Sequence, residues 1–315
     1  MLAGRPSSQL QAAAGRLGLP WRSSVLTDAV ALDAMLANVR IVINTAGPFA
    51  HTAGALMRAC IRNGCHYLDL SNEAATFEDA WSLDEAARLA GISLVPGAGF
   101  GTAAAQALAT HVLGRLRDPE ALTIVRSSRQ GARTPGVKRT MLEIMGQPGA
   151  SIKDGRWQSG GLKITGFDLT GGRSTGIPVG LGDAYATAKA TGIRHVSAYA
   201  TIRMNLLPAR IGIPIVRRLV RASLSLPQWP HRGGRKKAEP HGLEHVELWI
   251  QAANAHGENA VSYMRVEKAG EVAARLALQG VRELRVRAVP GVLTAGELIG
   301  APDVLKLIGV QITDI

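Results

Sequence analysis

The chain has 315 residues, of which 46% are hydrophobic and 19% are charged, so it can bury one large core or two smaller ones and does not read as generally disordered. A formal net charge of +12 favours anionic partners, which include nucleic acid, an acidic membrane face and a phosphorylated cofactor. Aromatic residues make up only 4%, too few for the stacking surfaces of a single-strand binder, so no nucleic-acid partner is expected.

The cysteines and the amino terminus point to a cytoplasmic protein. Cys60 and Cys65 are the only cysteines, and their spacing does not match a zinc site, so we expect reduced, buried thiols. The histidines show no ligand spacing either, and no metal site is expected. The chain has no signal-peptide pattern and no apolar run near the ~18 residues of a membrane span.

The first elements are a strand end and two helices. Residues 2–5 read as the end of a strand, and Ser8 and Gln11 stand at the spacing of a capping box that opens a helix, with Gly18 just past its end. Thr27 or Asp28 then caps a second helix that ends near residue 37.

Residues 39–73 contain the motif around which this half of the chain is organised. Apolar runs at 39–43 and 66–70 predict strands, and each run ends in small polar residues. Between them lies a helical pattern that Thr52 opens and Gly64 closes. The carboxyl ends of parallel strands form the ligand crevice of an open sheet, so both strand ends are expected at one cofactor site.

The strand spacing then repeats. Ser82 and Glu85 suggest a capping box for the next helix, a strand follows at 92–95, and a helix is expected from Thr102 to about residue 116. Strand starts near residues 41, 67 and 92 recur about every 25 residues, as in right-handed βαβ crossovers. The fold class is therefore α/β with a Rossmann-like parallel sheet over residues 1–118.

The pattern changes after Asp118 and Pro119. Residues 196–204 and 246–251 alternate between apolar and polar, which predicts an antiparallel sheet with one solvated face. Residues 119–268 are interpreted as a second, α+β domain for substrate binding and dimerisation, so a homodimer is expected. Residues 269–315, where helical periodicity returns, are expected to pack back on the first domain.

Residues 206–237 are apolar but contain many basic side chains, among them Arg217, Arg218 and Arg221. A basic amphipathic helix of this kind suits peripheral contact with an anionic membrane or an acidic partner. The alternative is a peripheral helix whose arginines are simply solvated.

A glycine-rich turn of the dinucleotide-binding type is not found before residue 39. The one match in spacing is Gly99, Gly101 and Ala104, which follow a strand and open a helix. Alternating strands and helices do not continue after it. Residues 96–101 are therefore interpreted as a loop beside the nicotinamide end of a cofactor, where glycines allow close backbone approach.

Three motifs carry a family resemblance: NTAGPF at 44–49, HYLDLSNE at 66–73 and VPGAGF at 95–100. With Gly182-Asp183 and Pro290-Gly291 further on, they resemble the saccharopine-dehydrogenase-like oxidoreductases, and most of all the branch of trans-acting enoyl reductases. The resemblance implies a Rossmann domain, a second α/β domain and NADP(H) as hydride carrier.

The resemblance also implies where the cofactor binds. Arg5 is matched to the position that holds the adenosine 2′-phosphate, which suits a guanidinium. The family pattern begins with a first strand, a glycine-rich turn and a helix, whereas Met1 falls inside the second strand. Two alternatives remain open: the true start lies upstream, or the chain is a fragment with impaired cofactor binding. The residues assigned to the cofactor are Arg5, Asn44, Thr45, Ala46, Gly47, Pro48, Phe49, Ser71, Asn72, Glu73, Gly97 and Gly99.

The proton donor is less well defined. His66, Tyr67 and Asp69 are the candidate catalytic residues because they stand nearest to the expected nicotinamide. Asp183 and Tyr185 of the second domain are alternatives that would reach across the cleft. A hydride carrier leaves the protein mainly to align the reactants, so no nucleophile motif is needed.

The predicted activity is NADP-dependent reduction of an activated C=C bond in a lipid-like or acyl-thioester substrate. One alternative is saccharopine-type reduction or oxidation of a C–N bond in an amino-acid conjugate. Another is a non-catalytic remnant that binds a partner or a membrane through residues 206–237.

Overall fold

The computed structural model describes residues 1–129, 147, 149–169, 172–202, 213, 215, 217–218 and 245–315. The basic segment 206–237, for which membrane contact was predicted, lies almost wholly outside these residues. Among the described residues, no helix combines the length and apolar character needed to cross a bilayer.

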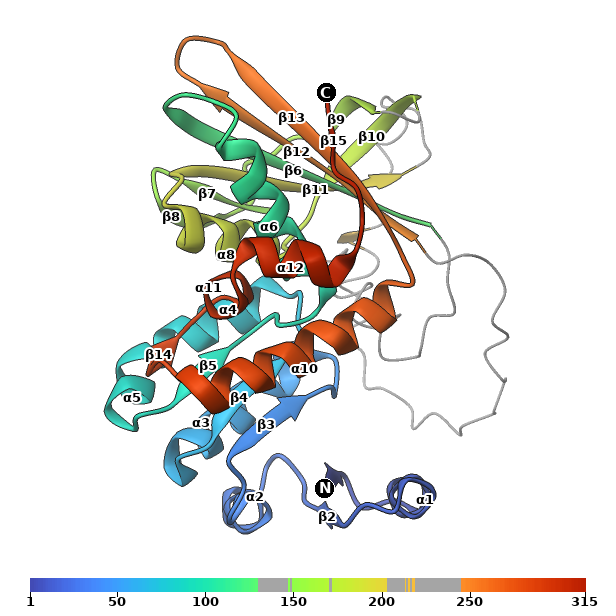
Figure 1. Ribbon diagram of the computed structural model, residues 1–315, viewed down its shortest axis with the longest axis vertical. Coiled ribbons are helices and arrows are strands. Elements are labelled where there is room, and N and C mark those ends of the chain that lie inside the picture. The colour runs from blue at the N-terminus through green and yellow to red at the C-terminus, as the bar shows by residue number, and fades with distance from the viewer. Residues whose placement is uncertain are drawn as a thin grey trace.

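Strands and helices alternate in the first 113 residues (Figure 1). In chain order these elements are β1 (Leu2–Gly4), α1 (Ser8–Leu17), β2 (Trp21–Ser23), α2 (Ala29–Leu36), β3 (Ile41–Asn44), η1 (Phe49–His51), α3 (Ala53–Asn63), β4 (His66–Asp69), α4 (Ala74–Ser82), α5 (Asp84–Leu89), β5 (Ser93–Val95) and α6 (Phe100–Leu113). The three strands predicted at 39–43, 66–70 and 92–95 are thus β3, β4 and β5.

The strands of this part form two separate parallel sheets. One has the order β14-β5-β4-β3, where β14 (Gly291–Val292) comes from the carboxyl-terminal part of the chain. The other, within the described residues, consists of β1 and β2. Among the described residues, β1 and β3 do not pair with each other. The α/β fold class with a parallel Rossmann-like sheet is confirmed, and its β1–β2 part stands beyond the β3 edge (Figure 1).

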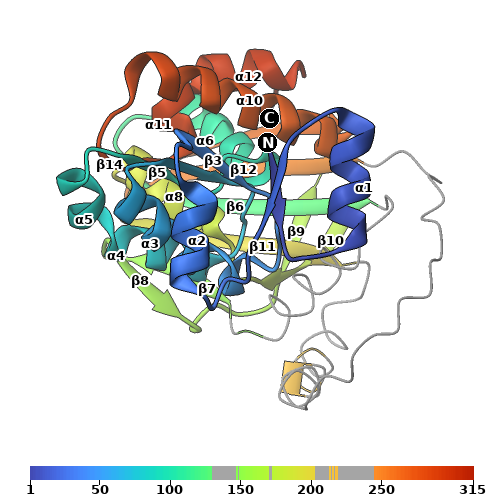
Figure 2. The ribbon, with the colours of Figure 1, turned by 90° about the horizontal axis from the view of Figure 1, so that it is seen from below.

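Successive side chains of β4 point to opposite faces of the β14-β5-β4-β3 sheet. Tyr67 packs with residues of α2 and α3 on one face, and Leu68 packs with α6 and α10 (Ala269–Arg287) on the other. Both side chains are shielded from solvent: Tyr67 and Leu68 are 0% exposed, as is Leu94 of the neighbouring strand β5. Figure 2 shows the helices on both sides of the sheet. Period-two burial on both faces is what a covered parallel sheet requires.

The helix starts correct three local predictions. Ser7, not Ser8, caps α1 by accepting a hydrogen bond from the Leu10 amide (3.1 Å). Asp28 caps α2 as expected. The Ser82–Glu85 capping box is wrong because α4 runs through Ser82, whose hydroxyl donates to the Asp79 carbonyl (2.6 Å). α6 begins at Phe100, two residues before the predicted start.

In the second part of the chain, the described residues form a nine-stranded sheet. Its elements are β6 (Pro119–Arg129), β7 (Ala150–Lys153), β8 (Arg156–Ser159), β9 (Thr165–Leu169), β10 (Gly172–Pro178), α8 (Gly182–Thr191), β11 (His195–Ile202), β12 (His245–Asn254), β13 (Asn259–Glu267) and β15 (Thr313–Asp314). β6 and β11 run parallel, so this sheet is mixed rather than purely antiparallel as predicted. The change of sheet after α6 also rules out a continued βαβ series after Gly99, and with it the use of Gly99 and Gly101 as a dinucleotide fingerprint.

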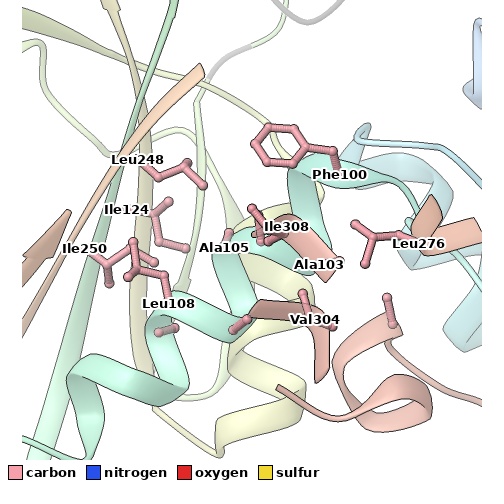
Figure 3. Close-up of a cluster of buried hydrophobic side chains, with 14 of the residues drawn as sticks. Phe100, Ala103, Ala105, Leu108, Ile124, Leu248, Ile250, Leu276, Val304 and Ile308 are labelled. Carbon is pink, nitrogen blue, oxygen red and sulfur yellow. The ribbon is translucent and has the colours of Figure 1, made fainter. Parts of the chain in front are cut away.

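α6 is the centre of the core that joins the two sheets. Its residues Ala105 and Leu108 belong to one buried cluster with Ile124 and Leu248 of the second sheet, and α12 (Ala301–Ile308) packs against it (Figure 3). α11 (Ala295–Ile299) links β14 to α12. The carboxyl-terminal segment therefore contributes β14 to the first sheet and β15 to the second.

Candidate active site

The carboxyl ends of β3, β4 and β5 lie side by side at one edge of the first sheet. Asn44 pairs with Asp69 and Leu68 pairs with Val95, so the three strands end in register. The loops that follow hold most of the residues predicted to bind a cofactor. We call these loops, residues 44–49, 70–73 and 96–99, the strand-tip loops.

Asp69 connects two of the strand-tip loops. Its Oδ1 atom accepts hydrogen bonds from the amides of Ser71 (2.9 Å) and Gly97 (2.7 Å), and its Oδ2 accepts one from the Tyr67 hydroxyl (2.9 Å). The Asp69 carbonyl also accepts from the Ala98 amide (2.8 Å). Because Asp69 is 0% exposed, these donors replace the water that its carboxylate has lost.

Asn44 extends the same network to the third loop. Its side-chain nitrogen donates to the Tyr67 hydroxyl (3.1 Å) and to Thr52 Oγ1 (3.2 Å), and its oxygen accepts from the Ala46 amide (3.0 Å). Thr52 in turn donates to the Ala46 carbonyl (2.6 Å). The hydroxyl of Thr52 therefore holds the β3 loop instead of capping α3, which was its predicted role.

Protonation in this network follows from burial. Burial raises the pKa of Asp69, and the donated hydrogen bonds oppose that rise only in part. Burial, and next the neighbouring Asp69 charge, raises the pKa of Tyr67 well above its usual range. Tyr67 therefore keeps its proton, which points at Asp69 Oδ2.

Glu73 ties two of the strand-tip loops together at their outer side. Its Oε1 accepts from the Phe49 amide (3.1 Å) and its Oε2 from the Asn72 amide (3.0 Å), and the residue is only 6% exposed. Phe49 follows the Gly47–Pro48 peptide bond, which is cis. Residues 45–47 themselves are exposed and lie over the buried network.

The glycines of the third loop face protein atoms. A Cβ atom on Gly97 would lie 2.5 Å from Phe77 Cζ, and one on Gly99 would lie 3.3 Å from the Leu70 Cα. Gly97 also has φ +69°, a conformation that favours glycine. These glycines therefore let Phe77 and Leu70 pack closely against the loop.

His66 and Arg5 lie apart from the strand-tip loops. His66 begins β4, at the opposite end of the strand from Asp69, and its Nδ1 accepts from the Ser93 amide (3.0 Å). Burial and nearby Arg40 lower its pKa. This position does not support His66 as the proton donor. Arg5 is exposed just after β1, in the two-stranded sheet.

A second polar cluster, which sequence reasoning missed, lies where the two sheets meet. Arg126 of β6 forms an ion pair with Asp183 of α8, and both contact Asn72 of the strand-tip loop 70–73. The sequence offers Asp183 as a residue that reaches across the cleft, whereas it does not single out Arg126. The available signal was a charged residue on the core-facing side of β6, in line with Leu122 and Ile124.

The described residues fit one end of a dinucleotide better than the other. Exposed residues 45–47 above a rigid buried network suit the nicotinamide end. Around β1, the turn into α1 contains Arg5, Pro6 and Ser7, with the Leu10 amide capped by Ser7. No glycine-rich turn for a pyrophosphate opens a helix in the described part of the chain before β3. Within the described residues, no group of histidine, cysteine and carboxylate side chains could hold a metal ion.

Comparison with known proteins shows what this chain is similar to. Residues 2–95 match the family model of the saccharopine dehydrogenase NADP binding domain. A saccharopine dehydrogenase-like oxidoreductase from Bos taurus is 28% identical over 158 residues, which cover 48% of this chain and 34% of the relative. The matched region thus spans about a third of the length of that curated relative.

Two solved structures share the fold. One is saccharopine dehydrogenase (L-Glu forming) from Saccharomyces cerevisiae, with a TM-score of 0.61, 14% identity and coverage of 99% of this chain and 93% of that chain. The other is the homospermidine synthase of Legionella pneumophila in complex with NAD, with a TM-score of 0.63, 10% identity and coverage of 99% and 84%. At these identities they show the fold. The family model and the curated relative show that this chain is similar to saccharopine dehydrogenase-like oxidoreductases, and the family model supports a nicotinamide cofactor.

Proposed function

We propose that this chain is an NADP(H)-dependent oxidoreductase that binds the nicotinamide end of its cofactor at the strand-tip loops. The observation that carries the proposal is the buried network of Asn44, Tyr67 and Asp69, which fixes three loops beneath exposed residues 45–47. The match of residues 2–95 to an NADP-binding domain supports it. When bound, the cofactor supplies or accepts a hydride, and the protein holds the reacting groups in place.

The chain's own residues have positioning roles in this proposal. Tyr67 keeps its proton and directs it at Asp69, and Asp69 fixes the Ser71 and Gly97 amides, so both hold the loops rather than contact substrate. Arg5 is proposed to bind the adenosine 2′-phosphate, because its exposed guanidinium suits bidentate phosphate contact. The proposed cofactor contacts are Thr45, Ala46, Gly47, Pro48, Phe49, Ser71, Asn72, Glu73, Gly97 and Gly99.

The proposed substrate is an enoyl group on a lipid-like or thioester carrier. The buried charged side chains at the described site are already engaged: Asp69 and Glu73 accept from backbone amides, and Arg126 pairs with Asp183. A C–N substrate derived from amino acids carries carboxylates that need cationic partners. The internal pairing favours an uncharged acceptor, although a saccharopine-type reaction is compatible with the family.

Cofactor binding is the direct test. NADPH added to the purified chain should raise its melting temperature, because a ligand at about 100 times its Kd stabilises the native state by ~2.7 kcal/mol. NADH should raise it less, and Arg5→Met should reduce this difference between the two cofactors. A folded protein whose melting temperature and tryptophan fluorescence respond to neither cofactor would contradict the proposal.

The substrate class needs a separate assay. NADPH oxidation should be faster with a 2-enoyl thioester than with a mixture of an amino acid and a 2-oxo acid, which presents a C=N acceptor. The opposite order would replace the enoyl proposal by the C–N alternative and leave the cofactor proposal intact.

A further inference from the structure

The second strand-tip loop, residues 70–73, is held from outside the first sheet. The Asn72 carbonyl accepts a hydrogen bond from the Gly182 amide (2.9 Å), and the Ala74 amide donates to the Gly180 carbonyl (3.2 Å). Gly182 is in close contact with this region, since a Cβ atom there would lie 2.1 Å from the Phe77 ring. Two backbone hydrogen bonds thus join the loop to the start of α8.

The side chains reinforce this connection. In the amide orientation that satisfies its neighbours, the Asn72 nitrogen donates to Asp183 Oδ1 (2.8 Å) and Thr102 Oγ1 (3.1 Å), and its oxygen accepts from Arg126 Nη1 (2.6 Å). Arg126 also forms the ion pair with Asp183. The guanidinium lies against the start of α6, where a Cβ atom on Gly101 would come within 2.9 Å of it.

The Arg126–Asp183 pair is costly to bury. The Asp183 side chain is 0% exposed and that of Arg126 is 12% exposed. Burial raises the pKa of Asp183, and the charge of Arg126 opposes that rise. A buried ion pair often contributes little net stability compared with apolar residues of similar volume, but it fixes the geometry of the groups around it. Here the group it fixes is Asn72.

The Glu73 carboxylate links Asn72 to the strand-tip loop 44–49. Glu73 accepts from the Asn72 amide with one oxygen and from the Phe49 amide with the other. The anchor of the Ser71 and Gly97 amides is different, because both are held by Asp69 from within the first sheet. The strand-tip loops thus depend on two independent anchors.

We propose that Arg126 and Asp183 are positioning residues through which the second sheet sets the conformation of residues 72–74 and, through Glu73, of Phe49. The nicotinamide side of the site is then complete only when the two sheets are packed together. This inference rests on the proposed function for its relevance to catalysis, but the positioning itself is a property of the protein without cofactor.

Amide hydrogen exchange of the protein without cofactor tests the positioning. Arg126→Met should raise the exchange rate of the Phe49, Asn72 and Ala74 amides by about tenfold or more, because charge-assisted hydrogen bonds are lost. The Ser71 and Gly97 amides should be unchanged and serve as controls inside the same loops. Arg126→Lys, which keeps the charge, should give a smaller increase.

Two further variants keep the test decisive. Asn72→Ala leaves the Arg126–Asp183 pair intact and should give the same local increase at Phe49 and Ala74, even if Arg126→Met does not fold. Arg115→Met removes an ion pair with Asp314 and hydrogen bonds to Val261 and Ser262 just past the other end of α6, and should leave these amides unchanged. Unaltered exchange in Asn72→Ala, or an equal increase at Ser71 and Gly97, would overturn the inference.

A cofactor measurement relates the positioning to the site. Arg126→Met should weaken binding of NADPH by about tenfold while leaving that of 2′-phospho-ADP-ribose, which lacks the nicotinamide, unchanged. Equal weakening of both would overturn a role limited to the nicotinamide side. If the wild-type protein binds neither compound, the proposed function fails, while the exchange experiment still decides the positioning role.

Discussion

The strand-tip loops and the β1–β2 unit, which comprises β1, α1 and β2, are built in contrasting ways. The strand-tip loops rest on fully buried residues such as Tyr67 and Asp69 and are held from both sheets. In the β1–β2 unit, α1 buries only Ala14, while Leu17 and Trp21 are 62% and 43% exposed. The proposed nicotinamide end is thus fixed by interior contacts, and the proposed 2′-phosphate end by local ones.

The two regions are expected to respond differently to cofactor binding. Local opening costs little free energy where few apolar contacts are buried, so the β1–β2 unit is expected to open more readily than the strand-tip loops. A ligand that contacts both regions stabilises whichever of them opens more easily. We therefore expect the adenosine half of the cofactor to order the β1–β2 unit and the nicotinamide half to meet a preformed surface.

The largest expected effect comes from Asp69→Ala. The substitution leaves the Ser71 amide, the Gly97 amide and the Tyr67 hydroxyl buried without an acceptor, so it should lower the free energy of unfolding by about 3–5 kcal/mol. Urea denaturation monitored by tryptophan fluorescence measures it. A loss below about 1 kcal/mol would show that these loops are not held by Asp69.

Asp69→Asn keeps the shape of the side chain and removes its titratable carboxyl group. Since the pKa of Asp69 is raised above its usual 3.8 in the folded state, its contribution to stability is fully present below pH 3.8 and is lost as the pH rises through the folded pKa. The asparagine does not titrate. The stability of the wild type relative to Asp69→Asn should therefore be greater near pH 4 than near pH 7, and the reverse trend would contradict a raised pKa.

An intermediate effect is expected from Gly97→Ala. The new methyl group would clash with Phe77 in a backbone conformation of φ +69°, so we expect a loss of about 2–3 kcal/mol. Gly64→Ala is the control, because Gly64 has a similar φ of +65° but open space around it, and its loss should be about 1 kcal/mol. Equal losses would mean that packing against Phe77 adds nothing.

The smallest expected effect lies in the β1–β2 unit. Arg22 donates to the Met35 and Ala37 carbonyls (both 2.8 Å) and so ties β2 to the end of α2. Arg22→Met should increase hydrogen exchange across residues 1–23 but change global stability by less than about 1 kcal/mol. A larger global loss would show that this unit folds together with the main sheet and would remove the contrast between the two regions.

Local patterns predicted the first sheet well. The apolar runs at 39–43, 66–70 and 92–95 predicted the three parallel strands, and Gly64 ended a helix as expected. The Ser82 prediction failed because a serine three residues before a glutamate is common inside helices as well as at their starts. Spacing alone does not say whether α4 has ended.

Local sequence patterns could not predict the side-chain contacts that form the site, because these contacts join residues of different elements. Tyr67 and Asp69 were noted as candidate proton donors, yet only the structure shows that they face each other beneath Asn44. Arg126 and Asp183 are 57 residues apart, and nothing in their immediate neighbours indicates the pair. The sign in the sequence was the charge of Arg126 on the alternating positions that also hold Leu122 and Ile124.

The most direct test of the account is hydrogen exchange of the wild-type chain with and without NADPH. We predict protection of residues 45–49 and 71–74 by NADPH, whereas 2′-phospho-ADP-ribose should protect only the region around Arg5 and the start of α1. Protection confined to other parts of the chain, or none from a folded protein, would contradict a nicotinamide site at the strand-tip loops.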